Sequence, residues 1–279
     1  MGANSIRSNL TKEDSISEIR LVLSGDIEKK KVIVVVEGND DVIFFNGKVS
    51  CDVILVESFS GKEGVKEIVN LSSNKNVIGI CDKDYETECS ETQIFYYDYS
   101  SLEIMMAMSD KAFSKVVDEL MIDGYSPIEL RRKLFADLRW LSLFRMLNYQ
   151  QNWGIKFEGL AINKIFNKQN LNINIRKCSE EIINQNPNKK TYQEEIIDVV
   201  KREYEKPIDY HVLPYITQGH DFMGYLHCYS DQKRYKVSNI IGLFRCTYSD
   251  EYFVQTDIFS AIKEYGESNG LAIWNDYQL

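Results

Sequence analysis

The feature that most constrains the fold is a set of short, almost wholly apolar runs that end at glycine or acidic residues. KVIVVVEG (31–38) is a continuous β-branched run, and CDVILVES (51–58) and NVIGICDKD (76–84) follow the same pattern. Runs of this length without polar alternation are typical of strands buried on both faces of a parallel sheet. QIFYYDY (93–99) is a candidate fourth strand.

Helical patterns lie between these runs. Residues 11–24 carry apolar side chains at helical spacing, and residues 61–73 repeat the pattern. Residues 39–47 fit a short helix with Asn39 or Asp40 as its cap. Strands that alternate with short helices predict an α/β fold built on a parallel sheet with flanking helices.

After about residue 101 the strand-like runs give way to helical patterns. The predicted helices span residues 101–122, 126–149 with Pro127 in the first turn, 191–206, and segments around 220–229, 235–246 and 251–265. Residues 163–190 are rich in Asn and Lys and are predicted to form a loop or weakly ordered structure. We therefore predict an N-terminal helix in 1–25, an α/β domain in 26–108 and a mostly α-helical C-terminal region in 109–279.

Composition and charge limit the class of protein. The 279 residues include 44% hydrophobic and 27% charged residues, as in ordinary globular proteins, which excludes a disordered or collagen-like chain. The formal charge of −9 argues against a protein that coats nucleic acid by bulk charge. Residues 31–104 hold six lysines and no arginine against eight glutamates and six aspartates, a balance of −8. The acidity is therefore concentrated in the predicted α/β domain.

The sequence also bears on compartment. The first residues are polar and lack the apolar core of a secretory signal, and no apolar run approaches the roughly 20 residues of a membrane span. The six cysteines show no CxxC pair and are expected to be free thiols: Cys51, Cys81, Cys89, Cys178, Cys228 and Cys246. We therefore expect a cytoplasmic protein without membrane association.

Four carboxylates follow two of the predicted strands. Glu37 ends the first strand, and Asp41 stands four residues later, about one helical turn on. Asp82 and Asp84 follow the third strand in CDKDY. Because the carboxyl ends of parallel strands form the ligand edge of such a sheet, these side chains are expected to lie close together. A divalent cation would offset their repulsion, and oxygen ligands favour Mg²⁺ or Mn²⁺. CDKDY alone is equally consistent with a solvated turn.

These motifs resemble the Toprim signature, in which a Glu-Gly follows the first strand and an Asp-x-Asp follows the third. VVVEGNDDVIFF and VIGICDKDY carry the match, which covers roughly residues 31–104. Toprim domains occur in topoisomerases, bacterial primases, small nucleases and OLD-family nucleases. More narrowly, the chain resembles the DUF4435 family, stand-alone Toprim-like proteins of similar length that include the effector subunit of the PARIS anti-phage system. Glu103 in YDYSSLEIMM and the Gly-His-Asp of TQGHDFMGYL, with His220 and Asp221, support this narrower match.

The resemblance implies a Rossmann-like Toprim sheet and metal-dependent phosphodiester chemistry. Glu37, Asp82 and Asp84 would be catalytic, and together with Asp41 they would hold one or two Mg²⁺ or Mn²⁺ ions. A metal lowers the pKa of bound water and stabilises charge on the attacking and leaving oxygens. The chain lacks the additional modules of topoisomerases and primases, which favours a nuclease. The expected activity is that of an endonuclease effector that cleaves RNA, with tRNA as one substrate, or DNA, when released from an ABC-type ATPase partner. A homodimer is compatible with this interpretation.

Other residues are weaker candidates. Lys62 in SGKEG would contact a phosphate or stand as a solvated lysine at a helix start, and Glu103 would add an acidic group. His220 with Asp221 would form a functional pair or cap a helix. A basic helix is either a phosphate-binding stripe or a solvated face, with Arg131, Arg132, Lys133 and Arg139 as candidate substrate contacts and Arg145 near the same face.

The sequence is also compatible with two other functional classes. A non-catalytic subunit of an ATPase complex would use the acidic face for docking, although complete carboxylates at 37, 82 and 84 argue against lost catalysis. Acyl-phosphate phosphatases and receiver domains also cluster aspartates on a parallel sheet. They usually place the key aspartate after the first strand, where this chain has Glu37.

Overall fold

The chain forms two compact units in the computed structural model, which describes residues 11–86 and 92–277. The first, called here the α/β unit, combines residues 1–98 with residues 250–279. The second, the helical unit, comprises residues 99–249. The predicted boundary at residue 108 therefore differs from the structure in two ways: the chain leaves the α/β unit at residue 98 and returns to it at residue 250.

A four-stranded parallel sheet is the centre of the α/β unit, as predicted. Its order is β2 (Val53–Glu57), β1 (Val32–Val36), β3 (Val77–Cys81) and β4 (Ile94–Tyr96). Every residue of β1 and β3 is buried, which explains their unbroken apolar runs. In this order the chain moves to opposite sides of β1 to form β2 and β3, so the switch point lies between β1 and β3. Ligands of open α/β sheets bind beyond the carboxyl ends of strands at such a point.

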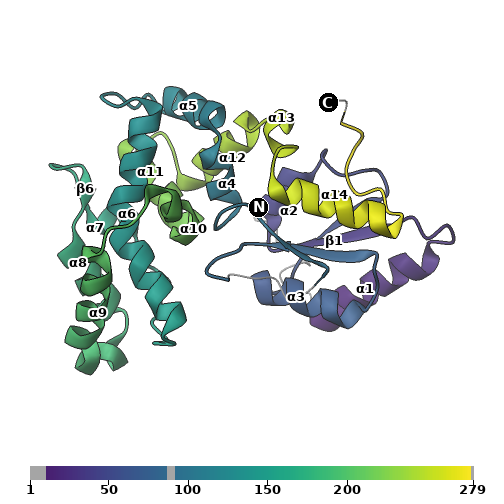
Figure 1. Ribbon diagram of the computed structural model, residues 1–279, viewed down its shortest axis with the longest axis horizontal. Coiled ribbons are helices and arrows are strands. Elements are labelled where there is room, and N and C mark those ends of the chain that lie inside the picture. Colours follow the sequence, from purple (N-terminus) through teal and green to yellow (C-terminus); the bar gives the residue numbers. More distant parts are fainter. Residues whose placement is uncertain (1–10, 87–91, 278–279) are drawn as a thin grey trace. The chain divides into compact units, whose positions relative to one another are not determined.

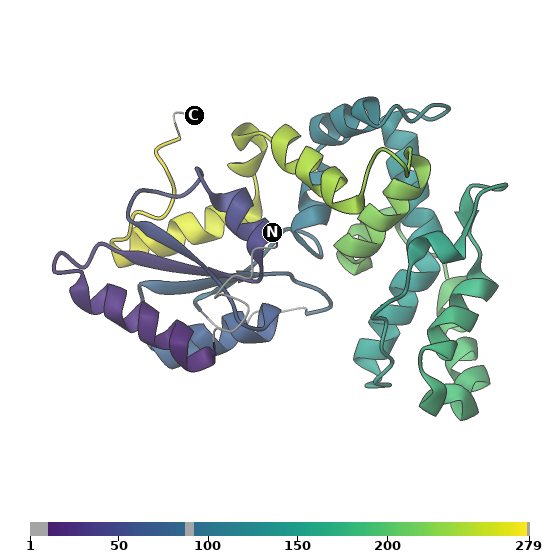
Figure 2. The same cartoon turned by 180° about the vertical axis from the view of Figure 1, so that it is seen from behind.

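Helices cover both faces of this sheet (Figures 1 and 2). One face is covered by α1 (Lys12–Gly25) and α3 (Gly61–Ser72), whose apolar side chains pack against β1 and β3. The other is covered by α2 (Asn39–Phe45) and α14 (Asp257–Asn269). The predicted helices over 11–24, 39–47 and 61–73 are confirmed. The cap of α2 is Gly38 rather than Asn39 or Asp40.

The last thirty residues complete the α/β unit rather than the helical unit. After α13 (Asp250–Phe253), α14 packs along β4, and Trp274 stacks on Phe45 and Phe259. Asp98 accepts hydrogen bonds from the first two N–H groups of α14, at 3.1 Å each. Burial of these aromatic rings against the sheet explains why this segment does not belong with the helices that precede it.

The helical unit is organised around one long helix, α6 (Pro127–Gln150). This helix packs against α5 (Asp110–Glu119), α9 (Gln193–Glu205), α10 (Leu213–Ile216) and α11 (Gly219–Tyr229). The other elements of the helical unit are α4 (Leu102–Met108), α7 (Ile162–Ile165), β5 (Phe166–Asn167), β6 (Asn172–Ile173), α8 (Ile175–Asn184), η2 (Pro187–Tyr192), η3 (Tyr210–Val212) and α12 (Val237–Thr247).

Two predictions for this unit were wrong. The single helix expected over 101–122 is divided at Ser109, whose hydroxyl caps α5. The segment 163–190, expected to be a loop, contains α7, a short hairpin and α8. In α8, Cys178, Ile182 and Ile183 are buried on one face. The high content of Asn and Lys in the surrounding segment concealed this narrow apolar stripe.

Candidate active site at the carboxyl edge of the sheet

Glu37 joins the ends of the two central strands. It follows β1, and its Oε1 accepts a hydrogen bond of 2.7 Å from the backbone N–H of Asp82, which follows β3. Its other carboxylate oxygen faces the first residue of α3: a Cβ added at Gly61 would lie 3.6 Å from Oε2. Glu37 therefore lies at the switch point of the sheet, next to the first residue of α3.

The surroundings of Glu37 favour its protonated form. Burial raises the pKa of Glu37 to about 7, and the negative charges of Asp41 and Asp84 act in the same direction. The hydrogen bond from the Asp82 backbone and the charge of Lys62 act in the opposite direction and do not outweigh the burial. A carboxyl group that titrates near neutral pH beside two other carboxylates is a common feature of catalytic and cation-binding sites.

The Asp41 carboxylate accepts hydrogen bonds from two parts of the chain, the residue that caps α2 and the residue that follows β4. Its Oδ2 accepts from the Gly38 N–H at 3.0 Å, and its Oδ1 accepts from the buried hydroxyl of Tyr97. Asp41 itself is 8% exposed. The negative charge of Asp41 acts to raise the pKa of Glu37.

Asp84 is paired with a lysine. Its Oδ2 lies 3.1 Å from the Nζ of Lys62 in α3, and its backbone adopts a left-handed conformation with φ +50°. The same ammonium lies 3.0 Å from Glu86 and 3.2 Å from the carbonyl oxygen of Lys83. Lys62 is therefore not the solvated lysine considered from the sequence, since its side chain is 11% exposed.

The arrangement fits a divalent cation in ligand type but is not assembled around one. Glu37, Asp41, Asp82 and Asp84, called here the acidic site, offer oxygen ligands of the kind Mg²⁺ and Mn²⁺ prefer. Across residues 11–86 and 92–277, no three His, Cys, Asp or Glu side chains are grouped so that they could hold a metal ion. Glu37, Asp41 and Asp84 each accept hydrogen bonds from donors within the protein.

Sequence reasoning missed Glu86 and Tyr97. Glu86 accepts hydrogen bonds from Lys62, Lys66 and Tyr96. Burial acts to raise the pKa of Glu86, but these hydrogen bonds outweigh it and lower the pKa to about 2. Tyr97 could have been found by the edge rule, since it directly follows β4 and β4 ends at the same edge as β1 and β3.

The Gly-His-Asp segment is a packing feature of the helical unit. Gly219 lies against α4: an added Cβ would lie 2.4 Å from a carboxylate oxygen of Glu103 and 2.3 Å from the hydroxyl of Ser101. Asp221 is 2% exposed, and its carboxylate accepts two hydrogen bonds from the Arg145 guanidinium, of 2.6 and 2.9 Å. His220 is exposed. These contacts assign Gly219 and Asp221 to the joining of α4, α6 and α11.

The predicted basic stripe on α6 is largely occupied by internal contacts. Arg131 is 9% exposed and donates to the carbonyl oxygens of the last residues of α4 and to Asp110. Lys133 pairs with Asp137 at 2.8 Å, and Arg139 donates to a backbone carbonyl oxygen and lies over the Tyr204 ring. Arg132 is exposed. Because Arg131 is buried and makes these contacts, its guanidinium is not accessible to the phosphates of a nucleic acid.

Exposed basic residues gather instead in the segment that was predicted to be a loop. From α7 through η2 the side chains of five basic residues are exposed, interspersed with exposed asparagines: Lys164, Lys168, Arg176, Lys177 and Lys190. Glu180, the exposed acidic residue of α8, pairs with Arg176 at 2.9 Å. This segment is therefore the stronger candidate for contact with phosphates in the helical unit.

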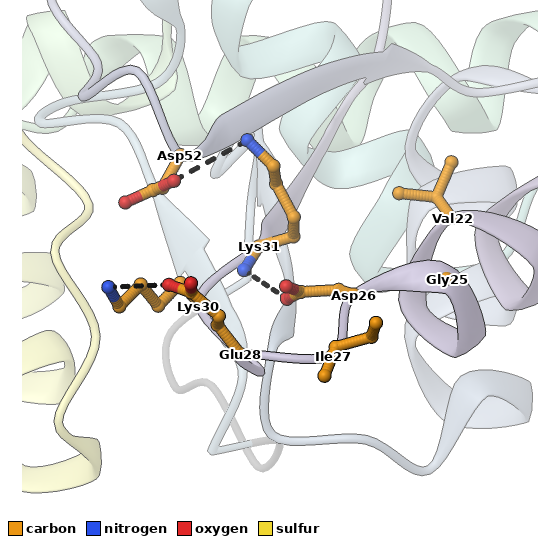
Figure 3. Close-up of a pocket in the computed structure, with 8 residues that line it drawn as sticks. All are labelled: Val22, Gly25, Asp26, Ile27, Glu28, Lys30, Lys31 and Asp52. Carbon is orange, nitrogen blue, oxygen red and sulfur yellow. Dashed lines mark hydrogen bonds and ion pairs between the residues drawn. The ribbon is translucent and has the colours of Figure 1, made fainter.

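A pocket of about 370 Å³ lies at the opposite, amino-terminal edge of the sheet (Figure 3). It is lined by the end of α1, the following loop and Asp52, which precedes β2. Its charged groups pair with one another: Lys30 with Glu28 at 2.7 Å, and Lys31 with Asp52 at 3.4 Å. The pocket contains none of the predicted site residues.

No family model matches the chain, and no curated protein matches it. No described helix is long and apolar enough to cross a membrane. The five cysteines within the described ranges are free, and Cys89 lies outside them.

Proposed function

We propose that this chain is a metal-dependent nuclease of the Toprim type. The single observation that carries the proposal is the position of Glu37, a half-buried carboxyl group that bridges the ends of β1 and β3 beside Asp41 and Asp84. The order Glu-Gly and Asp-x-Asp on adjacent central strands is the pattern on which the resemblance to Toprim and DUF4435 proteins rests. β1 and β3 are parallel neighbours, so their carboxyl ends share the edge at which ligands of such sheets usually bind, and this supports the proposal.

The residues of the acidic site would divide the chemistry between them. Asp84, Asp82 and Asp41 would hold one or two Mg²⁺ or Mn²⁺ ions, and Glu37 would complete the ligand set or accept a proton near the scissile phosphate. A bound cation would supply stabilisation of phosphate charge and a lowered pKa of bound water. A carboxyl group with a pKa of about 7 is suited to proton transfer at neutral pH, because it exchanges its proton there readily.

The proposed substrate is RNA, with tRNA as one example, in preference to DNA. The resemblance to the DUF4435 family motivates this choice. The exposed basic residues from α7 through η2 also support it, because they could contact the phosphates of a nucleic acid that the acidic α/β unit would repel. In the same proposal, the chain acts in anti-phage defence in the cytoplasm and is released from an ABC-type ATPase partner.

The test is a cleavage assay on tRNA and on DNA with Mg²⁺ or Mn²⁺. Glu37→Ala and Asp84→Asn are expected to lower the cleavage rate by at least about a hundredfold, the contribution typical of a group that transfers protons or holds the reacting charges. The matched control is Glu57→Ala, which removes an exposed carboxylate from the same edge at the end of β2. Full activity in Glu37→Ala would refute the assignment, and cleavage of DNA alone would correct the substrate.

A second candidate is a non-catalytic subunit of an ATPase complex. This function is favoured by the hydrogen bonds that the carboxylates of Glu37, Asp41 and Asp84 already accept from donors within the protein, since a metal would have to replace them. The same assay with and without the ATPase distinguishes the two functions, because a docking subunit has no metal-dependent cleavage under either condition.

A further inference from the structure

The ammonium of Lys62 forms an ion pair with Asp84 of the acidic site. Lys62 is the second residue of α3, and its Nζ contacts three acceptors: Asp84 at 3.1 Å, Glu86 at 3.0 Å and the carbonyl oxygen of Lys83 at 3.2 Å. A lysine ammonium has three donors and no acceptor, so these three contacts satisfy it fully. It also lies 5.1 Å from the centre of the Tyr96 ring, within the range of a cation–π contact.

The position is maintained from several sides. The Lys62 side chain is 11% exposed, and Glu86, its second partner, is itself fixed by Lys66 at 2.9 and 3.0 Å and by the hydroxyl of Tyr96. Of the two carboxylates that pair with Lys62, that of Asp84 is the more exposed, at 32% against 20% for Glu86. Of the two anions that hold Lys62, Asp84 is thus the one with access for an incoming cation.

We infer that Lys62 is a tethered cation that takes the place of a metal at Asp84, and that a divalent cation and the Lys62 ammonium compete for that carboxylate. This inference rests on the proposed function, because it assigns Asp84 to the metal. Two cations on one carboxylate repel each other, so a metal that binds Asp84 displaces the ammonium toward Glu86 and Lys83, where two of its three acceptors remain. Glu86 is therefore the anion that holds Lys62 while Asp84 is engaged.

The competition explains why a partly buried lysine lies beside an otherwise acidic edge. Lys62 is a positioning residue in this scheme: it acts on the metal through Asp84 and makes no contact with substrate.

The chain offers a matched control for removing this charge. Lys66 stands one helical turn after Lys62, is also a lysine, and pairs with Glu86. Lys62→Met and Lys66→Met remove the same charge from the same helix, but only the first removes the competitor at Asp84. A general electrostatic effect would act in both variants.

The experiment measures Mn²⁺ affinity of the full chain by isothermal titration calorimetry, with thermal unfolding to verify that each variant is folded. Lys62→Met is expected to bind Mn²⁺ at least about tenfold more tightly than the wild type, within the usual range of coupling between two ligands. Lys66→Met is expected to stay within about threefold of it, since the competing ammonium is retained. Lys62→Gln, which keeps hydrogen-bond donors without the charge, replaces Lys62→Met if that variant does not fold.

The outcomes separate this inference from the proposed function. Tighter binding in the Lys62 variant alone supports the competition. Unchanged or weaker binding in that variant overturns it and leaves the metal site in place, and so does an equal gain in both variants. Absence of Mn²⁺ binding in the wild type and both variants refutes the metal site itself and the competition with it.

Discussion

At the scale of single residues, Glu37 is the side chain whose environment is least expected of an ordinary structural glutamate. Structural carboxylates are usually either exposed or paired with a cation. Glu37 is half-buried, accepts one backbone hydrogen bond and lies near two other negative charges. Its ionisation in the folded state is therefore unfavourable, and this has a consequence that can be measured without any substrate.

The first prediction is that Glu37→Gln stabilises the metal-free protein above pH 7. The pKa of Glu37 is about 7 in the folded state against an ordinary value of 4.5, so its contribution to stability is fully present below pH 4.5 and is lost as the pH rises through 7. Glutamine keeps the acceptor for the Asp82 N–H but cannot ionise. At pH 8 the variant is expected to gain up to about 3 kcal/mol in the free energy of unfolding, with no difference near pH 4.

Chemical denaturation across pH in the presence of EDTA measures this difference. Addition of Mn²⁺ at pH 8 should then stabilise the wild type more than Glu37→Gln, because the metal binds only the folded state and the variant lacks one of its ligands. A stability difference between the two proteins that does not change with pH would show that the carboxyl of Glu37 titrates normally.

The residues that the sequence predicted for the acidic site and those it missed differ for a physical reason. Glu37 and Asp82 could be placed together because parallel strands end at a common edge, and the structure joins them by a hydrogen bond. The partners of Lys62 and Asp221 could not be foreseen, because each comes from a different element: Asp84 and Glu86 follow β3, and Arg145 lies in α6. Only tertiary packing brings such pairs together.

At the scale of elements, the close approach of α3 to the sheet depends on Gly79 in β3. A Cβ at this position would lie 2.5 Å from Val65 of α3 and 2.7 Å from Ile94 of β4. α3 supplies Lys62 and Gly61 to the acidic site, so the distance between this helix and the sheet also sets the position of those residues.

The second prediction concerns that contact. Gly79→Ala is expected to lower the free energy of unfolding by about 1–3 kcal/mol, because the added methyl group overfills the packed layer between α3 and β3. Thermal or denaturant unfolding measures the change. Gly25→Ala is the matched control: nothing lies within 4 Å of its Cβ position, and it is expected to stay within about 0.5 kcal/mol of the wild type. Equal losses in both variants would contradict the packing argument.

The elements themselves were predictable to different degrees. The strands and the helices of the α/β unit were found because their apolar residues follow strict patterns and their ends are marked by glycine or capping residues. α8 was missed because its buried face comprises few residues within an Asn-rich and Lys-rich segment. The division of α4 from α5 depends on one serine, Ser109, whose hydroxyl accepts from the Ala112 N–H at 3.3 Å.

At the scale of the whole molecule, the α/β unit is discontinuous in sequence. Residues 250–279 contribute α14 and Trp274 to it, and the backbone of residues 48–50 pairs with that of residues 273–275. The sequence did not reveal this return, since residues 251–265 carry an amphipathic helical pattern like those before them. Amphipathic periodicity identifies a helix with one buried face but not the unit against which that face packs.

The third prediction follows from this arrangement. A chain in which residues 1–98 are joined by a Gly/Ser linker to residues 250–279 is expected to fold cooperatively, whereas residues 1–98 alone are not. Without the C-terminal segment, Phe45 loses its ring contacts with Phe253 and Trp274, and Asp98 loses the two N–H donors of α14. One face of the sheet is then exposed to water, and a unit of this size has little stability to spare.

Circular dichroism during thermal unfolding and the dispersion of amide signals in NMR spectra distinguish the two chains. The linked chain should show a single unfolding transition and dispersed signals, and it should retain the Mn²⁺-dependent stabilisation, because all four carboxylates of the acidic site lie within residues 1–98. A control chain with Trp274→Ala in the linked form should unfold at lower temperature, because it removes the ring that stacks on Phe45 and Phe259. A folded and fully stable 1–98 fragment would show instead that the returning segment is dispensable and that the division predicted from sequence describes the folding unit better.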